Sequence, residues 1–313
     1  MAVLIDPPAW PAHGTVFSHL VSDSSLEELH AFARDTGLSP RAFDLDHYDV
    51  PAHRHAELVA AGAEPVSGRE LVRRLVGSGL RTPARRRPAR RAAVLTRRWQ
   101  ALFAGTPARE AAVASAGRDL LARWSEPHRR YHSPDHLLAV LEAVDLLERA
   151  GEDLGPRPRA VRLAAWFHDA VYDADPARPT GQDEEDSARL AERMLASPGL
   201  AVPADVVAET ARLVRLTSDH RPAPGDAAGA VLSDADLEVL GRCAQAYDAY
   251  VRAVRADFAH VTQEQWRTGR ARVLEGLLAA DHLFATRSEE RFSRNAETVV
   301  LISYAVFCLK KQK

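Results

Sequence analysis

RLAAWFHDAVYDA, residues 162–174, is the stretch of sequence that decides the fold of most of this chain. Its apolar residues recur at a spacing of three to four, which predicts a helix. His168 and Asp169 come from the middle of the stretch, and their neighbours, Ala164 to Phe167 and Val171, are apolar on nearly every side. A carboxylate in such a helix is costly unless it is paired or bound to a metal. The stretch therefore predicts a buried polar site inside a helical core.

The same helical spacing of apolar residues continues over most of the chain from about residue 92. Stretches such as REAAVASAGRDLLARW and ADVVAETARLVRLTSD show it clearly, and loops rich in Pro, Gly and Asp separate them. No run of alternating β-branched residues interrupts the pattern. We therefore expect an all-helical domain over residues 99–295.

A second polar group lies in YHSPDHLLAV, residues 131–140. Ser133 can cap a helix whose first position is taken by Pro134. His136 then projects from the first turn, and His132 lies just before the cap. The two imidazoles can be close to each other without sharing one role.

A third group lies in SDADLEVL, where we expect Asp234 and Asp236 to open another helix, with Asp234 as its N-cap. Imidazole and carboxylate ligands from separate helices suit Mn, Fe, Co, Ni, Zn or Mg, and they leave positions open for water and a phosphate oxygen. A bound divalent ion would lower the pKa of its water and neutralise charge on a phosphoryl group.

Four motifs in the same order, YHSPDH, FHDAVYD, DEEDSA and DADL, carry a family resemblance over about residues 95–290. This region resembles the HD superfamily of metal-dependent phosphohydrolases, whose defining pattern is His…His-Asp…Asp. The likeness is strongest to a bacterial branch of predicted phosphohydrolases. The resemblance implies hydrolysis of a phosphomonoester or phosphodiester (EC 3.1 class), such as a nucleotide, by a metal-activated water. It implies a divalent metal ion held by His136, His168, Asp169 and Asp236.

The resemblance also implies roles for residues around the ion. His132 becomes the candidate general acid, and Glu184 becomes the candidate that orients the attacking water, whereas Asp183 stands where the branch has Asn. His220 could reach a substrate phosphate or interact with a helix C-terminus. The alternatives are purely structural roles. His132 would cap its helix or bond to a carboxylate, and Glu184 would belong to an acidic first turn of a helix. The second set of metal-binding histidines found in cyclic-nucleotide phosphodiesterases is not evident after FHDAVYD, so a mononuclear site, or a site with a weak second ion, is expected.

Residues 1–80 show strands alternating with helices, which predicts a small α/β module with a parallel sheet. AVLID, RAFDL and EPV are the strand candidates. Ser25 with Glu28 and Ser67 with Glu70 are capping-box pairs that open two helices, and the segment from Pro51 to Gly62 has a helical pattern.

The N-terminal module has its own group of acids and histidines. Because ligands bind at the carboxyl ends of parallel strands, we expect several of them to converge. The alternatives are loop residues that form turns and caps, or a second acid/base or metal site. The segment resembles a small bacterial domain of unknown function, which implies no mechanism. The candidates are Asp6, His19, Asp23, Asp46, His47 and Asp49.

Between the two domains, residues 81–98 form an arginine-rich segment. The stretch RTPARRRPARRAAVLTRRW holds eight arginines and two prolines, which indicates a solvated linker that runs into the next helix. A phosphate-backbone contact strip is the alternative, and Trp99 is its single aromatic residue, so a nucleic-acid partner is disfavoured. Residues 296–313 look atypical, because every lysine of the chain falls in its last four residues.

Composition limits the remaining functional classes. The 313 residues suffice for two domains, and a net charge of −2 gives no global argument for nucleic acid or an anionic membrane. Two cysteines, the lack of a signal-peptide pattern and the lack of a long apolar run predict a cytoplasmic protein without a membrane span. The expected partner is a small phosphorylated substrate, and no oligomeric state is indicated. The alternative function is a non-catalytic sensor whose helical domain binds nucleotide and metal and acts through the N-terminal module.

Overall fold

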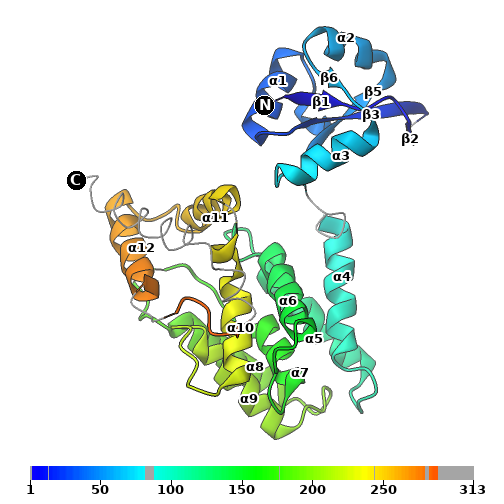
Figure 1. Cartoon of the computed structure of the whole chain (residues 1–313). Coiled ribbons are helices and arrows are strands. Elements are labelled where there is room, and N and C mark those ends of the chain that lie inside the picture. The colour runs from blue at the N-terminus through cyan, green and yellow to red at the C-terminus, as the bar shows by residue number, and fades with distance from the viewer. Residues whose placement is uncertain are drawn as a thin grey trace. The chain divides into compact units, whose positions relative to one another are not determined.

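A computed structural model describes residues 2–12, 14–81, 88–175, 177–242, 244–278 and 282–287. The chain divides between residues 90 and 91 into two units, a small α/β unit followed by a helical unit (Figure 1). This confirms the expected order of an α/β module and a helical part. None of the described helices combines the length and the apolar character needed to span a bilayer. The atypical tail, residues 296–313, lies outside the described residues.

The N-terminal unit is built on a sheet of short strands with helices on both faces. Leu29 of α1 and Leu58 of α2 pack on the face that carries Ile5 and Leu20. Leu71 and Leu75 of α3 pack on the opposite face, which carries Leu4 and Val21. Alternate strand residues thus enter two separate apolar layers. The strand order is β4 (Phe43–Asp44), β5 (His47–Pro51), β3 (Thr15–Ser22), β1 (Val3–Ile5) and β6 (Glu64–Pro65), with β2 (Trp10–Ala12) paired to β3.

The prediction of a parallel sheet was wrong for most of these strands. Only β1 and β6 pair in parallel, whereas the pairs β1–β3, β2–β3, β3–β5 and β4–β5 are antiparallel. The physical reason is the absence of helices between β1, β2 and β3. A turn that contains Gly14, with a φ of 76°, joins Ala12 to Thr15 and folds β3 back on β2.

The N-terminal helices begin where the capping residues predict. They are α1 (Leu26–Asp35), α2 (His55–Ala60) and α3 (Gly68–Gly77), with 3₁₀ turns at Pro40–Ala42 and Ala52–Arg54. Ser25 accepts a hydrogen bond from the backbone N–H of Glu28 at 3.1 Å, and Ser67 accepts one from Glu70 at 3.2 Å. The Glu28 carboxylate accepts a bond from Ser22 at 2.5 Å. The cap therefore ties α1 to the end of β3.

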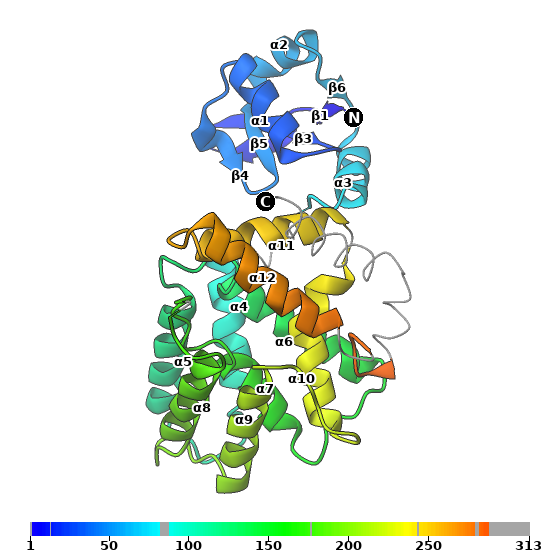
Figure 2. The same ribbon diagram turned by 90° about the vertical axis from the view of Figure 1, so that its left-hand side faces the viewer.

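The helical unit packs around α7, which lies against α6, α8, α9 and α10 (Figure 2). Trp99, Trp124, Trp166 and Phe167 are at most 1% exposed and fill its core. A smaller apolar cluster joins α11 and α12 to Tyr131. The helices are α4 (Pro88–Ala101), α5 (Glu110–Trp124), α6 (Pro134–Arg149), α7 (Pro158–Phe167), α8 (Gln182–Leu195), α9 (Ala204–Leu216), α10 (Ala227–Leu237), α11 (Ala244–Asp257) and α12 (Gln263–Leu278), with a 3₁₀ turn at Glu238–Gly241.

The helical unit starts earlier than predicted, because the C-terminal part of the arginine-rich segment is α4. Leu95 and Trp99 of this helix are buried, and the Trp99 indole N–H donates to the Val113 carbonyl at 2.8 Å. The linker predicted over residues 81–98 is thus helical from Pro88, and residues 82–87 lie outside the described residues.

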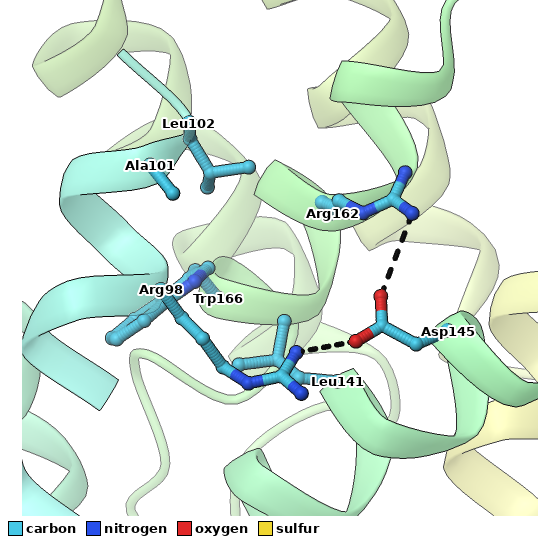
Figure 3. Close-up of a pocket in the computed structure, with 7 residues that line it drawn as sticks. All are labelled: Arg98, Ala101, Leu102, Leu141, Asp145, Arg162 and Trp166. Atoms are coloured by element: carbon cyan, nitrogen blue, oxygen red, sulfur yellow. Dashed lines mark hydrogen bonds and ion pairs between the residues drawn. The ribbon is translucent and has the colours of Figure 1, made fainter. Parts of the chain in front are cut away.

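Arginines of α4 are paired with carboxylates of their own unit. Arg91 bonds to Asp135, and Arg98 bonds to Asp145 at 2.7 Å. Figure 3 shows a hollow in which Asp145 of α6 lies between Arg98 and Arg162 of α7. These ion pairs bridge α4, α6 and α7, which leaves these arginines less suited to a phosphate backbone than the sequence alone indicates.

Candidate metal centre

His168 and Asp169 lie at the C-terminal end of α7, not in the middle of a helix as predicted. The helix ends at Phe167, and His168 still donates its N–H to the Ala164 carbonyl at 2.9 Å. The chain then leaves the helical path because the Val171 N–H donates to the Ser187 hydroxyl of α8 at 2.9 Å. The end of the helix frees both side chains to reach one point.

The buried side chain of Arg129 fixes the backbone beyond α7. Its guanidinium donates to the Asp169 carbonyl at 2.6 Å and to the Ala170 carbonyl at 3.4 Å. Carbonyls at a helix C-terminus have no partner within the helix, and an arginine can satisfy them. Arg129 was not predicted from the sequence, because nothing in its local pattern distinguishes it from the other arginines.

Asp236 also lies at the end of a helix rather than at its start. It is in the last turn of α10, whose N-cap is Asp226, and the Asp226 carboxylate accepts the Gly229 N–H at 2.9 Å. Asp234, which we expected to cap this helix, instead accepts the backbone N–H groups of Ala285 at 2.8 Å and Thr286 at 2.7 Å. His136 projects from the first turn of α6 as predicted, with Ser133 as the N-cap.

Three of the four predicted ligands, His136, His168 and Asp236, place one ligand atom each within 4.8 Å of one another between α6, α7 and α10. Nε2 of His136 lies 3.2 Å from Nε2 of His168 and 2.9 Å from Oδ1 of Asp236. Nε2 of His168 lies 3.4 Å from Oδ1 of Asp236. With metal–ligand bonds of about 2.0–2.2 Å, neighbouring ligand atoms lie roughly 3.0–3.5 Å apart, so these three spacings fit a single small divalent ion. The fourth residue, Asp169, borders this group, with Oδ2 3.2 Å from Nε2 of His168 and 3.7 Å from Nε2 of His136.

The hydrogen bonds of the imidazoles fit the same ion. Nδ1 of His168 lies 3.0 Å from the Ala165 carbonyl, so this nitrogen carries a proton and donates it. In the neutral ring, Nε2 is then left with its lone pair facing His136 and Asp169. A second hydrogen bond that orients the ring in this way is the usual arrangement for a metal-binding histidine.

The electrostatics of the four residues favour a cation. Burial would lower the pKa of His168, but the Asp169 and Asp236 carboxylates outweigh it and raise that pKa well above its ordinary value. Burial would likewise raise the pKa of Asp236, yet the neighbouring imidazoles lower it well below its ordinary value. Two carboxylates inside the protein therefore need positive charge beside them, which a proton or a divalent ion can supply.

His220 holds the outer oxygen of Asp236. Its Nε2 lies 2.8 Å from Oδ2 of Asp236, whereas Oδ1 of the same carboxylate faces the imidazoles. His220 follows α9 with a φ of 54°. This contact orients a ligand and differs from both roles considered for His220 in the sequence.

His132 lies beside the four ligands and is held by a residue that sequence reasoning missed. Its Nδ1 is 2.8 Å from Oδ2 of Asp257, the last residue of α11. Asp257 is buried, and it also accepts backbone N–H groups of Arg130 and Tyr131. Burial would raise the pKa of Asp257, but the hydrogen bond from His132 and those from the backbone lower it. The carboxylate thus stays ionised and holds the ring of His132 through Nδ1.

Glu184 lies in the first turn of α8, on the side of the Asp169 carboxylate. Burial raises its pKa, and the charges of Asp169 and Asp183 raise it further. Asp183 accepts the Asp173 N–H at 3.1 Å and pairs with Arg178 at 2.8 Å. Asp183 therefore holds the loop after α7, whereas Glu184 lies near the four ligands.

Most of the predicted N-terminal residues also come together, on adjacent strands. Nδ1 of His19 on β3 lies 3.0 Å from Oδ2 of Asp6, and Nδ1 of His47 on β5 lies 2.6 Å from Oδ1 of Asp46. Asp49 lies 3.5 Å from Nε2 of His47. Burial would lower the pKa of His47, but Asp46 and Asp49 raise it to about 9. These contacts define an N-terminal cluster on one face of the sheet.

Asp23 does not belong to the N-terminal cluster. It accepts the backbone N–H of Ala2 at 2.8 Å and the Arg74 guanidinium at 3.0 Å. These bonds tie the end of β3 to the start of the chain and to α3. Asp23 is therefore a structural residue.

Comparison with known proteins identifies the N-terminal unit alone. The family described as "Protein of unknown function (DUF4031)" matches residues 3–78. The N-terminal unit is a DUF4031 domain. The expected likeness to a domain of unknown function is confirmed there, and the match does not extend into the helical unit. No curated protein and no solved structure matches the chain.

Proposed function

We propose that the helical unit is a divalent-metal-dependent phosphoester hydrolase of the HD type. The observation that carries this proposal is the convergence of His136, His168 and Asp236 from α6, α7 and α10, with spacings between 2.9 and 3.4 Å. An oxygen of Asp169 lies 3.2 and 3.7 Å from the two imidazole nitrogens. His136, His168, Asp169 and Asp236 would hold the ion. Such an ion supplies an activated water and neutralises charge on a phosphoryl group.

The remaining residues of the site have roles that follow from their positions. His132, held through Nδ1 by Asp257, presents its other ring nitrogen as a proton donor for the leaving oxygen. Glu184, whose raised pKa reflects burial beside Asp169, accepts a hydrogen bond from the attacking water and orients it. The side chains of Asp169 and His132 are 15% and 19% exposed, so the site is open to a substrate on this side.

A sensor that binds metal and nucleotide without turnover is the competing function. Binding of metal and nucleotide alone does not need a proton donor such as His132. It also does not need a buried carboxylate, such as Asp257, that orients the donor. The His132–Asp257 pair therefore supports the enzyme over the sensor.

A screen of the full chain against nucleotides and simple phosphoesters tests the proposal. The metal-free protein would be assayed with Mn²⁺, Co²⁺, Ni²⁺ or Mg²⁺, and released phosphate or product measured. His168→Gln and Asp169→Asn should lose both the ion and the activity, whereas exposed His260→Gln should keep both. Activity that is equal in the parent and in His168→Gln would show that the activity comes from another site or from a contaminant. Saturable nucleotide binding without turnover would favour the sensor.

A further inference from the structure

We propose that the N-terminal cluster is a second metal site, in which His19, His47 and Asp49 bind a divalent transition-metal ion independently of the helical unit. A ring nitrogen from each histidine and a carboxylate oxygen of Asp49 all lie within 4.8 Å of one another. Two imidazoles and one carboxylate suit Zn, Fe, Co, Ni or Mn and leave positions open for water or an oxygen ligand. Nothing in the DUF4031 description assigns a metal to these residues.

The sheet register explains why three residues far apart in the sequence meet. His19 of β3 pairs directly with Asp49 of β5, so their side chains project from the same face. His47 lies two residues before Asp49 on the same strand and therefore also projects from that face. The rings of His19 and His47 are 4.9 Å apart at their centres.

Each histidine is oriented by a buried carboxylate that binds the opposite ring nitrogen. Asp6, which is 3% exposed, bonds to Nδ1 of His19, and Asp46, which is 1% exposed, bonds to Nδ1 of His47. When Nδ1 donates to a carboxylate, the neutral ring keeps a lone pair on Nε2. A carboxylate–histidine pair is the usual support of a metal-binding imidazole. Here it occurs twice in one cluster.

The two supporting carboxylates are themselves fixed. Asp6 accepts the Trp10 indole N–H at 3.2 Å and the backbone N–H of His19 at 2.5 Å. It also lies against the first residue of α3, since a Cβ added at Gly68 would be 3.5 Å from its Oδ2. The positive end of that helix stabilises the negative charge. Asp46 is held by Arg81 at 3.0 Å. The cluster thus has an outer layer of contacts that holds the imidazoles in place.

The cluster is accessible from one side only. His47 is 5% exposed in its side chain, whereas His19 is 25% and Asp49 is 47% exposed. An ion and a further oxygen ligand can therefore approach over Asp49 and His19. The competing explanation is that His47 is an imidazolium held between Asp46 and Asp49, in which case the cluster needs no ion.

Counting ions in the full chain separates the two sites. The chain would be stripped with a chelator and dialysed against Co²⁺ or Zn²⁺, and bound metal measured per chain. We expect two ions in the parent, one in His168→Gln/Asp169→Asn and one in His19→Gln. We expect no ion when all three substitutions are combined. Asp49→Asn removes a half-exposed ligand without opening a cavity, and it should also lose one ion. His53→Gln, on the exposed turn after β5, is the matched control and should keep both ions.

Two outcomes would overturn this second site. One is equal metal content in the parent, His19→Gln and Asp49→Asn; the other is a His168→Gln/Asp169→Asn chain that binds no ion at all. Circular dichroism would verify that each variant is folded. Because the helical ligands are changed separately, failure of the N-terminal site leaves the proposed hydrolase site untouched, and the reverse also holds.

Discussion

The imidazole of His132 bonds through Nδ1 to the buried carboxylate of Asp257, a residue 125 positions later in the chain. Asp257 also accepts the N–H groups of Arg130 and Tyr131, so one carboxylate fixes the backbone and the ring together. The contact makes Asp257 a positioning residue for the proposed proton donor.

Asp257→Asn should slow turnover about tenfold to a thousandfold while the metal content stays intact, and His132→Ala should slow it about 10²- to 10⁴-fold. An amide keeps an acceptor for the backbone but removes the charged oxygen that bonds to Nδ1 of His132, so the ring is held less firmly. Asp248→Asn, an exposed position of the same helix, is the control. Unchanged turnover in Asp257→Asn, or loss of the ion, would contradict the assigned role.

His220→Ala should weaken ion binding at the helical site about 10- to 100-fold, which is the usual effect of removing a residue that orients a ligand. The reason is that Asp236 loses the 2.8 Å contact at its outer oxygen and can rotate away from the imidazoles. Metal titration of the variant measures this, and excess metal should restore activity. If saturating metal does not restore it, His220 acts on the substrate instead.

Gly117→Ala should destabilise the helical unit by about 1–3 kcal/mol, because overpacked cores force neighbouring side chains out of position. A Cβ at Gly117 of α5 would lie 2.6 Å from Cδ1 of Trp99, which is itself anchored to Val113. The control is Gly269→Ala in α12, where a Cβ meets nothing within 4 Å. Thermal unfolding should show a lower midpoint for the first variant and an unchanged or higher midpoint for the second.

Asp23→Asn should make the N-terminal unit less stable at pH 7 but not in acid. Burial would raise the pKa of Asp23, but the Arg74 guanidinium and the Ala2 N–H outweigh it and lower that pKa below 3.8. A lowered pKa contributes stability above the unfolded value, and this contribution is lost as the pH falls through the folded value. We expect a difference of about 1 kcal/mol at pH 7.

Urea titrations at pH 7 and at a pH below 3.8 would measure the difference in unfolding free energy between the parent and Asp23→Asn. The amide NMR signals of β1 and β3 would report the unfolding of the N-terminal unit. Asp35→Asn, an exposed acid at the end of α1, serves as the comparison. A gap between parent and Asp23→Asn that is as large in acid as at pH 7 would rule out the ionised carboxylate as its source.

The helices could be predicted because they are local features, whereas the set His136, His168, Asp169 and Asp236 came from the motifs that carry the family resemblance. Apolar spacing marks α5 to α9, and Ser133, Ser25 and Ser67 mark helix starts through their own neighbours. Asp257 and Arg129 could not be predicted, since their partners are fixed only by tertiary packing. The end of α7 was misplaced because the sequence continues the helical pattern beyond Phe167, where the helix ends. The start of α10 was placed too late because the residues RPAPGDAAG were taken as a loop, whereas the helix begins at Ala227.

In the N-terminal unit, the three strand candidates correspond to β1, β4 and β6, whereas β2, β3, β5 and the antiparallel pairing were not predicted. The strand β3 was missed because its residues alternate between two helical layers, and their polar members, Ser18 and His19, weaken the apolar signal. The convergence of Asp6 with His47 was expected, because Asp6 ends one strand candidate and His47 follows another. His19 and Asp23 were candidates without a predicted strand beside them, and the antiparallel β3 places His19 in the cluster and Asp23 at the opposite edge.

The tryptophans differ in their exposure to solvent, which makes Trp10 an intrinsic fluorescence probe of the N-terminal unit. Trp10 is 54% exposed with its ring 5.1 Å from His19, whereas Trp99, Trp124 and Trp166 are sealed in the other unit. Iodide should therefore quench the emission of Trp10 and spare those three indoles. A paramagnetic ion bound beside His19 would also quench the emission of Trp10. Tryptophan fluorescence could therefore follow metal occupancy of the N-terminal cluster without an attached dye.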